Sequence, residues 1–415
     1  MSPDQSVVIT GMGACSPAGF GCDALEALLR SGECRVAPIT RFDASAYRSV
    51  VAAEVPTEVE EHAIQAGRAV CLPVSSRYGL AALYGLGAIA EALHSSGLSQ
   101  GDFVAPDIGL IVGGSTAGTF EAEHALLSHP DDKSYFDRVP ADRFLLSPVG
   151  STASILAHSL AVSGSVSTIS TACSSAANAI GTAMTWLRSG RCSRVIAGGS
   201  DALCRLTHAG FNSLSLVDPA RPLPFDARRG GMCIGEGAAF FVLETADGAA
   251  ARGARPLARL AGFGAVSEAH HLVQPRGDGE GAAAAMRLAL LDAGIEPERV
   301  DYINAHGTAT PHNDLAEARG IRSLFGHRAD SLPVSSTKSQ IGHLLGASGA
   351  VELAACVLAM QHDFLPPTSG WSERDAEIPL DDFVPGRARP YEPGVILSNS
   401  FAFGGNDASL CLERA

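Results

Sequence analysis

The chain has 415 residues, of which 46% are apolar and 18% are charged, and this composition supports a large buried core and excludes a disordered protein. The formal net charge of −14 excludes sequence-independent nucleic-acid binding, which needs a basic surface, so an acidic partner would have to bind a local patch of arginines. The chain shows neither a secretory signal nor about 18 uninterrupted apolar residues, which predicts a cytoplasmic protein without membrane contact.

The usage of cysteine and lysine adds two expectations. The ten cysteines are scattered without a CxxC pair, so we expect most of them to be small buried hydrophobic residues. Only two lysines, Lys133 and Lys338, occur among 30 basic residues, which indicates that a retained lysine supplies a specifically required ammonium. For Lys133, in the polar run HPDDKS, chance is the simpler explanation.

Short β-branched runs that end in glycine alternate with Ala/Leu-rich helical stretches along the whole chain. This alternation predicts α/β layers with buried central sheets. The chain opens with VVITGMG, and ARLAGFG opens a second alternation near residue 255, a weak sign of internal duplication. Neither GMG nor GGSTAG completes a GxGxxG fingerprint followed by an acidic residue, so we expect no dinucleotide site.

A candidate nucleophile lies in SVSTISTACSSAANAIGTAMTWLRSG, which predicts a strand, a tight turn and a helix that runs to Gly190. Cys173 then falls at a buried helix N-terminus. There the helix dipole and free amides are expected to lower the pKa of the thiol and to form half of an oxyanion hole. The alternative is a small buried cysteine in a crowded turn.

Two histidines follow predicted strands. His306 precedes a helix in DYINAHGTATPHNDLAEARGIRSLFG, where Asp314 and Glu317 also fit a D-x-x-E capping box, the purely structural alternative for Glu317. The segment LPVSSTKSQIGHLLGASGAVELAACVLAM repeats this architecture with Lys338 and His343. The histidines lack the spacing of a metal site, so we predict no metal and two neutral imidazoles that donate hydrogen bonds.

The last element, VILSNSFAFGGNDASL, predicts a strand that runs into an aromatic and glycine-rich turn. Its amides could complete the oxyanion hole, and Gly404 and Gly405 permit positive φ angles. An ordinary β-turn is the alternative.

Together, these motifs closely resemble the elongating β-ketoacyl-acyl carrier protein synthases. The motifs are TACSS, HGTATPHND, KSQIGHLLGASG and NSFAFGG, and the resemblance covers the whole chain, including PFDARRGGMCIGEGAA at 224–239. It implies an α/β, thiolase-like fold of two similar βαβαβαββ halves in α/β/α/β/α layers, which we divide into residues 1–255 and 256–415, and a dimeric assembly.

The resemblance also implies roles for individual residues. Cys173 would accept the acyl chain from the phosphopantetheine of an acyl carrier protein, and His306 and His343 would assist malonyl decarboxylation. Lys338 would orient the His343 region and Glu317 would be linked to Lys338. The amides of Cys173 and Phe403 would form the oxyanion hole, with Phe403 gating the acyl pocket. The expected substrate contacts are Thr308 and Thr310 on the pantetheine arm, with Phe401, Thr116 and Phe211 as further candidates.

The implied partners are an acyl carrier protein and either a second copy or a subunit like a chain-length factor, with no cofactor beyond the carrier's phosphopantetheine. Four departures from the family pattern resemble synthases of aryl polyene or type II polyketide pathways. They are SSAANAIG after Cys173, Ala402 in place of a glycine, Arg229 in place of an acidic residue, and few basic residues in the segment 60–77.

Other functions fit the residues less well. A chain-length factor would have lost the nucleophile, whereas Cys173, both histidines and Lys338 are present. A thiolase needs a second catalytic cysteine, and Cys411 lies inside the terminal predicted strand. A chain-initiating synthase would carry Cys, His and Asn, and nothing in the sequence provides for the water activation of a cysteine hydrolase.

Overall fold

The computed structural model describes residues 6–70, 72, 78–127 and 145–415, so Lys133 and part of the segment 60–77 lie outside the described residues. The strands are β1 Val7–Ser16, β2 Gly19–Phe20, β3 Ala37–Pro38, β4 Val51–Ala52, β5 Ile108–Gly113, β6 Ser165–Ile169, β7 Arg194–Asp201, β8 Gly237–Thr245, β9 Ala258–Ser267, β10 Tyr302–Asn304, β11 Val334–Ser335, β12 Phe364–Leu365, β13 Arg389–Pro390, β14 Val395–Ser400 and β15 Asn406–Glu413. The helices are α1 Cys22–Ser31, α2 Glu58–Ala69, α3 Leu80–Ser96, α4 Thr119–Leu127, α6 Ser151–Leu160, α7 Ser175–Arg188, α8 Arg205–Ser213, α9 Ala246–Ala251, α10 Glu280–Ala293, α11 Pro311–Phe325, α12 Lys338–Ile341 and α13 Ser348–His362.

Most strands join one sheet in the order β11-β10-β14-β15-β9-β1-β8-β7-β5-β6. The outer strands β6, β5 and β7 are parallel, and β8 and β1 follow antiparallel; β11, β10, β14, β15 and β9 repeat this pattern. The two sets meet where Val7–Ile9 of β1 pairs with Ala258–Leu260 of β9. VVITGMG and ARLAGFG thus occupy equivalent strands, while the division at residues 255 and 256 stays a prediction.

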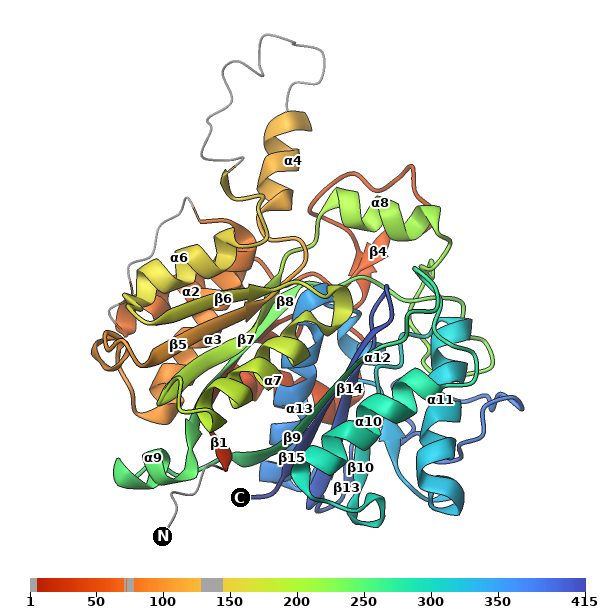
Figure 1. Cartoon of the computed structure of the whole chain (residues 1–415). Coiled ribbons are helices and arrows are strands. Elements are labelled where there is room, and N and C mark those ends of the chain that lie inside the picture. Colours follow the sequence, from red (N-terminus) through yellow and green to blue (C-terminus); the bar gives the residue numbers. More distant parts are fainter. Residues whose placement is uncertain (1–5, 71, 73–77, 128–144) are drawn as a thin grey trace.

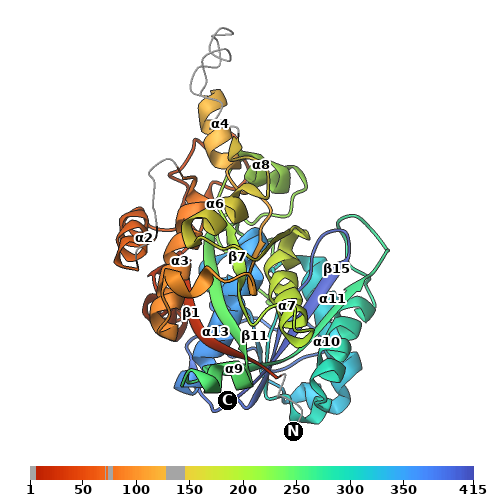
Figure 2. The same ribbon diagram turned by 60° about the vertical axis from the view of Figure 1, so that its left-hand side comes forward.

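The helices form three layers around the two halves of the sheet (Figures 1 and 2). Helix α3 packs on β1 and β8 on one outer side, and α10 packs on β9 and β15 on the other. Helix α7 contacts strands of both halves, as does α13. The result is the α/β/α/β/α arrangement that the family resemblance implies.

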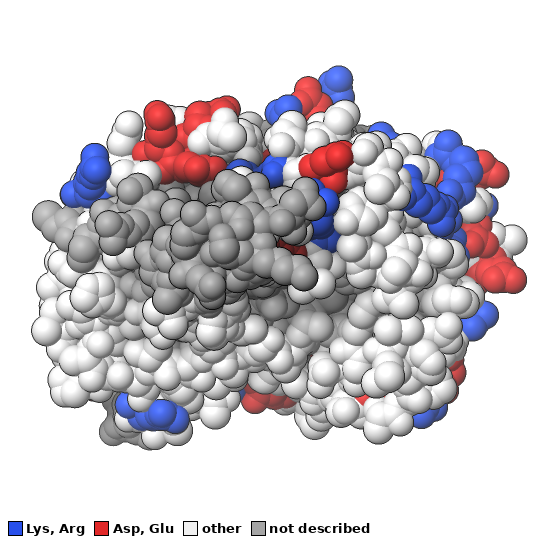
Figure 3. Space-filling view, turned by 90° about the horizontal axis from the view of Figure 1, so that it is seen from above, with Lys and Arg blue, Asp and Glu red and all other residues white. Residues whose placement is uncertain are grey.

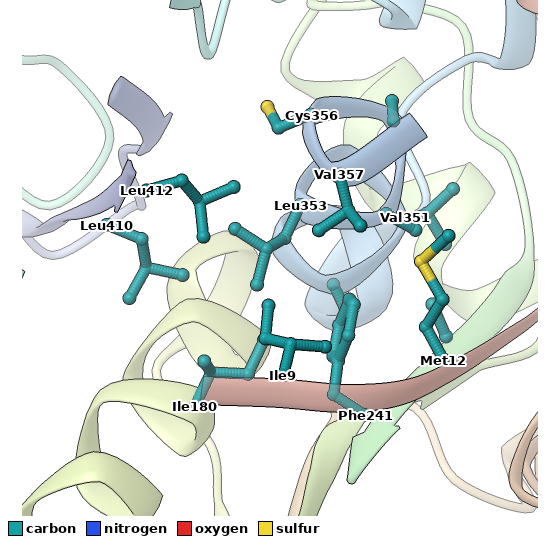
Figure 4. Packing of buried hydrophobic residues seen from close by; sticks show 14 of the residues in the cluster. Ile9, Met12, Ile180, Phe241, Val351, Leu353, Cys356, Val357, Leu410 and Leu412 are labelled. Carbon is teal, nitrogen blue, oxygen red and sulfur yellow. The ribbon is translucent and has the colours of Figure 1, made fainter. Parts of the chain in front are cut away.

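Helix α13 lies in the centre of the main apolar core, and residues 348–360 are all buried. A helix with buried, mostly apolar residues on all its sides is expected only where protein surrounds it. In the close-up, Ile9 and Phe241 of β1 and β8 lie on one side of Leu353, and Leu410 of β15 lies on another (Figure 4). Full burial of each such side chain contributes roughly 1.5–3 kcal/mol.

Small residues let α7 lie close to both halves of the sheet. A Cβ atom added to Gly113 of β5 would lie 2.5 Å from the backbone of Ala176, and one added to Gly181 would lie 2.4 Å from the ring of Phe263 in β9. This close packing holds the N-terminus of α7 in place, and the candidate nucleophile lies just before it.

Among the described residues, none of the helices has the length and apolar character needed to cross a membrane. The nine described cysteines are free thiols, and all except Cys34 are buried, which confirms the expectation for this part of the chain.

Candidate active site

Cys173 lies in a 3-10 turn, Ala172–Ser174, between β6 and α7, as the sequence predicts. The Ser175 hydroxyl braces this turn: it accepts a hydrogen bond from the Thr171 amide (2.9 Å) and donates one to the Ala172 carbonyl (2.6 Å). Ala172 has a φ of 51°, a left-handed conformation that costs a non-glycine residue on the order of 1 kcal/mol. Backbone strain next to a buried cysteine favours a functional turn over an ordinary one.

The environment of the Cys173 thiol differs from the sequence-based expectation. Burial raises the pKa of this thiol to about 11, and the Lys338 charge and the amides of Phe403 and Cys173 lower it by less. The expected low pKa is therefore wrong for the unacylated chain, because desolvation outweighs the helix N-terminus. The backbone amides of Phe403 and Cys173 both interact with the thiol, so both are near the position that the oxygen of a Cys173 thioester would take.

Glu317 holds the backbone of His306. The Glu317 carboxylate accepts hydrogen bonds from the His306 amide (2.9 Å) and the Gly307 amide (2.8 Å), and a third from the side chain of Asn399 (3.1 Å). Burial raises the pKa of Glu317 to about 7. Glu317 thus positions the loop after β10 that carries His306.

The capping-box interpretation of Asp314 and Glu317 is wrong. Helix α11 begins at Pro311 after Thr310, so Asp314 lies inside its first turn. Asp314 is buried and accepts hydrogen bonds from the amides of Phe225 (2.8 Å) and Ala309 (3.1 Å). Both carboxylates therefore tie neighbouring loops to α11.

Lys338 forms a buried ion pair with Glu352 of α13, and its side chain is 1% exposed. The predicted link between Lys338 and Glu317 is therefore wrong, because α13 brings a different carboxylate to the ammonium. Lys338 Nζ lies 3.3 Å from Nδ1 of His306, so its direct contact is with His306 and not with His343. An ammonium can only donate, which leaves the ring proton of His306 on Nε2.

His343 is held by its neighbours in the same tautomer. Its Nδ1 accepts a hydrogen bond from the Leu345 amide (2.9 Å) and lies 3.2 Å from the Ser348 hydroxyl. The ring proton therefore lies on Nε2, which is buried and has no partner among the described residues. Burial and the Lys338 charge hold the pKa of both imidazoles well below its ordinary value, so both are neutral near pH 7.

The two imidazoles face each other with ring centroids 5.5 Å apart and planes at 90°. They line one cavity of about 350 Å³ together with Cys173. The other predicted residues that line it are Thr308, Thr310, Phe401 and Phe403. Its exposed lining residues His271, Gln274 and His312 mark the opening to solvent.

The turn at 401–405 follows β14, as predicted, and its positive φ angles fall on Gly404 (83°) and Gly405 (71°). Ala402 therefore causes no left-handed strain in place of glycine. The ring of Phe403 packs against Phe211 with centroids 5.6 Å apart. This contact places Phe403 between the cavity and α8.

Two predicted substrate contacts do not line this cavity. Thr116 is buried, and its hydroxyl bonds the Asp201 carboxylate (2.9 Å) and the Ala202 carbonyl (3.0 Å). Phe211 is not among the described residues that line the cavity, and its ring packs against Phe403, which does line it. Arg229 is held by Asp375 at 2.5 Å, so it links two loops.

Sequence reasoning missed Glu352 and Asp201. Glu352 is the only acidic residue of α13 and lies in its buried part, and a buried lysine requires a counter-charge, so the pair could have been suspected. Asp201 ends β7 without any comparable signal, because its partners come from distant loops.

A buried thiol at a helix N-terminus, two backbone amides and two neutral imidazole donors in one cavity define a thioester-forming, thiolase-like condensing enzyme. The family models for the N-terminal and C-terminal domains of β-ketoacyl synthase match residues 4–249 and 257–372. The chain therefore belongs to the β-ketoacyl synthase family, and its fold and enzyme class are those that the sequence predicts.

Two curated relatives are similar over nearly the full length. The 3-oxoacyl-[acyl-carrier-protein] synthase 2 of Synechocystis sp. is 34% identical over 99% of this chain and 98% of that protein. The tetracenomycin polyketide synthase ketoacyl synthase alpha subunit of Streptomyces glaucescens is 36% identical over 99% of this chain and 97% of that protein. Among solved structures, the ishigamide ketosynthase/chain length factor has 33% identity and a TM-score of 0.90, with 99% of each chain covered.

Proposed function

We propose that this synthase condenses an acyl group held on Cys173 with a malonyl group held on an acyl carrier protein, with loss of carbon dioxide. The observation that supports this most strongly is the facing pair of neutral imidazoles, each with its proton on Nε2, in the cavity of Cys173. Two neutral donors stabilise a developing enolate oxygen without protonating it fully.

The first half-reaction transfers the acyl group. The Cys173 sulfur attacks the carrier thioester, the carbon–sulfur bond to the phosphopantetheine breaks, and the thiol proton ends on the released pantetheine thiol. The amides of Cys173 and Phe403 stabilise the oxyanion of this step. Because burial disfavours a free thiolate, proton removal and attack are expected to be coupled.

The second half-reaction forms the carbon–carbon bond. The malonyl thioester oxygen accepts hydrogen bonds from Nε2 of His306 and His343 while carbon dioxide leaves, and the resulting enolate carbon attacks the Cys173 thioester. Collapse releases the 3-oxoacyl carrier thioester and the Cys173 thiolate, which takes up one proton. The proposed reaction uses side chains and substrates alone, without a further cofactor.

The carrier protein is proposed to insert its pantetheine arm past Thr308 and Thr310, whose hydroxyls lie 2.9 Å apart in the cavity lining. Among the described residues on the face seen from above, basic and acidic side chains are interspersed and many residues are uncharged (Figure 3). The Synechocystis relative is named as a 3-oxoacyl-[acyl-carrier-protein] synthase, which supports a carrier-bound substrate here.

A second subunit is proposed to pair along β6. This strand ends the sheet, pairs with β5 alone among the described residues, and exposes 43% of Val166. Such an edge is available for pairing with another chain. The name of the ishigamide structure joins a ketosynthase with a chain length factor, which favours a heterodimer in a specialised polyketide or polyene pathway. The free cysteines favour the cytoplasm.

The function can be tested by intact mass spectrometry. We expect an octanoyl carrier protein to acylate Cys173, and added malonyl carrier protein to yield a product two carbons longer, whereas Cys173→Ala forms no adduct. An adduct that appears only after a second subunit is added would indicate an obligate heterodimer. No adduct under either condition would contradict the proposed function and favour the chain-length-factor alternative.

A further inference from the structure

Asp201 is a fully buried carboxylate at the end of β7 whose hydrogen-bond donors, as far as the chain is described, are all neutral. One set of donors comes from the loop after β5. The Ser115 amide bonds both carboxylate oxygens (2.9 Å each) and its hydroxyl bonds Oδ2 (2.9 Å), while the amide and hydroxyl of Thr116 bond Oδ1 (2.7 and 2.9 Å). A buried carboxylate without a basic partner is expensive to desolvate and persists only when hydrogen bonds satisfy it.

The remaining donor comes from the turn that follows His343. The amide of Gly346 bonds Asp201 Oδ2 at 2.7 Å. A Cβ atom on Gly346 would lie 2.7 Å from this oxygen and 2.7 Å from the Ser115 hydroxyl, so only glycine fits. Asp201 therefore connects the loop after β5 to the turn at 343–347.

This turn determines which nitrogen of His343 carries the proton. The Leu345 amide that bonds Nδ1 of His343 belongs to the residue directly before Gly346. Leu345 has a φ of 54°, which a non-glycine residue adopts only when its surroundings hold it there. The Asp201 bond to the next amide supplies such a restraint.

We propose that Asp201 is a positioning residue that keeps the 343–347 turn in the conformation that holds His343 in its Nε2–H tautomer. The consequence for catalysis rests on the proposed function, in which His343 donates from Nε2. Asp201 would then affect malonyl decarboxylation more than acylation of Cys173, because the thiol and its two amides belong to other segments.

Asp201→Asn tests this inference. The NH2 group of asparagine faces donors in either orientation of the amide. At the Oδ1 position it meets Thr116 and the Ser115 amide, and at the Oδ2 position it meets Ser115 and Gly346, so the restraint weakens without loss of volume. The matched control is Ser115→Ala, which removes one hydroxyl donor from Oδ2 but leaves the Gly346 bond.

In 15N-histidine NMR we expect wild type and Ser115→Ala to show His343 as a single Nε2–H tautomer and Asp201→Asn to show a mixture. We expect Asp201→Asn to lower malonyl decarboxylation at least tenfold and Cys173 acylation less than threefold, with Ser115→Ala within threefold in both. An unchanged tautomer in folded Asp201→Asn, or equal losses in both half-reactions, would overturn the inference.

Two further readouts keep the test decisive. If Asp201→Asn does not fold, amide exchange in the wild type decides: a strongly protected Gly346 amide supports the restraint, and exchange at the rate of an open loop contradicts it. If the wild type decarboxylates no malonyl substrate, the proposed function fails, whereas the tautomer comparison still tests the role of Asp201.

Discussion

Replacing Asp407 by asparagine should stabilise the protein, and increasingly so as the pH rises from 5 to 8. Asp407 lies at the start of β15 beside the cavity and is only 5% exposed. Its carboxyl group and that of Glu268 both approach Gly281: an added Cβ there would lie 2.6 Å from Asp407 Oδ2 and 2.0 Å from Glu268 Oε1. Burial and the Glu268 charge raise the pKa of Asp407 to about 8 from its ordinary 3.8.

The direction of this pH dependence of stability follows from proton linkage. The folded chain keeps the Asp407 proton up to about pH 8, whereas the unfolded chain releases it above 3.8, so stability is lost as the pH rises between these values. Each tenfold difference in proton affinity corresponds to about 1.4 kcal/mol, which sets an upper limit of roughly 6 kcal/mol on the total loss. Asparagine avoids this loss, since its amide can donate to Glu268 while its oxygen accepts from the Ala402 amide.

Thermal unfolding of wild type and Asp407→Asn at pH 5 and pH 8 checks this reasoning. We expect the advantage of the variant to be larger by about 2–4 kcal/mol at pH 8, which corresponds to a rise of several degrees in Tm. Asp23→Asn, an exposed change of the same kind at the start of α1, is the control. An equal advantage of Asp407→Asn at both pH values would refute the raised pKa of Asp407.

Three further predictions concern the active site. Glu352→Gln should lower the free energy of unfolding by about 3–5 kcal/mol, because it leaves the Lys338 ammonium buried and unpaired. A Lys338→Met, Glu352→Leu double variant should recover the Tm but not malonyl decarboxylation. Recovery of both would contradict a catalytic need for the ammonium. The rate of Cys173 alkylation by iodoacetamide, measured by peptide mass, should rise about tenfold per pH unit from pH 7 to 10, because the pKa of the thiol is about 11. A rate that reaches a plateau at pH 8 would show a more acidic thiol. Glu317→Gln should lower the kcat of decarboxylation at least tenfold, because its amide cannot accept from both the His306 and Gly307 amides; unchanged kcat with normal Cys173 acylation would exclude this positioning role.

Local sequence patterns were sufficient to predict the strands, turns and helices that carry the active-site residues. The strand-turn-helix around Cys173, the strand-loop-helix around His306, and the glycine turn at 404–405 all appear where predicted, because periodicity and turn residues act over only a few positions. The resemblance of the combined motifs also identified the family before any contact was known.

The sequence alone could not assign the partners of the charged groups. Lys338 pairs with Glu352 and not with Glu317. The Thr116 hydroxyl bonds Asp201 and does not line the cavity. These contacts join segments that are brought together only by the packing of α13 and the two halves of the sheet. The pKa of Cys173 depends in the same way on how deeply the folded chain buries it.

The sequence by itself thus determined the elements, the candidate nucleophile and the two histidines, since each depends on nearby residues. Only the tertiary structure decided their protonation and orientation. The Leu345 amide and the Lys338 ammonium select the tautomers of His343 and His306, and burial keeps both rings neutral. Tautomer and charge state follow from the distances and dielectric of the folded core, which no local pattern encodes.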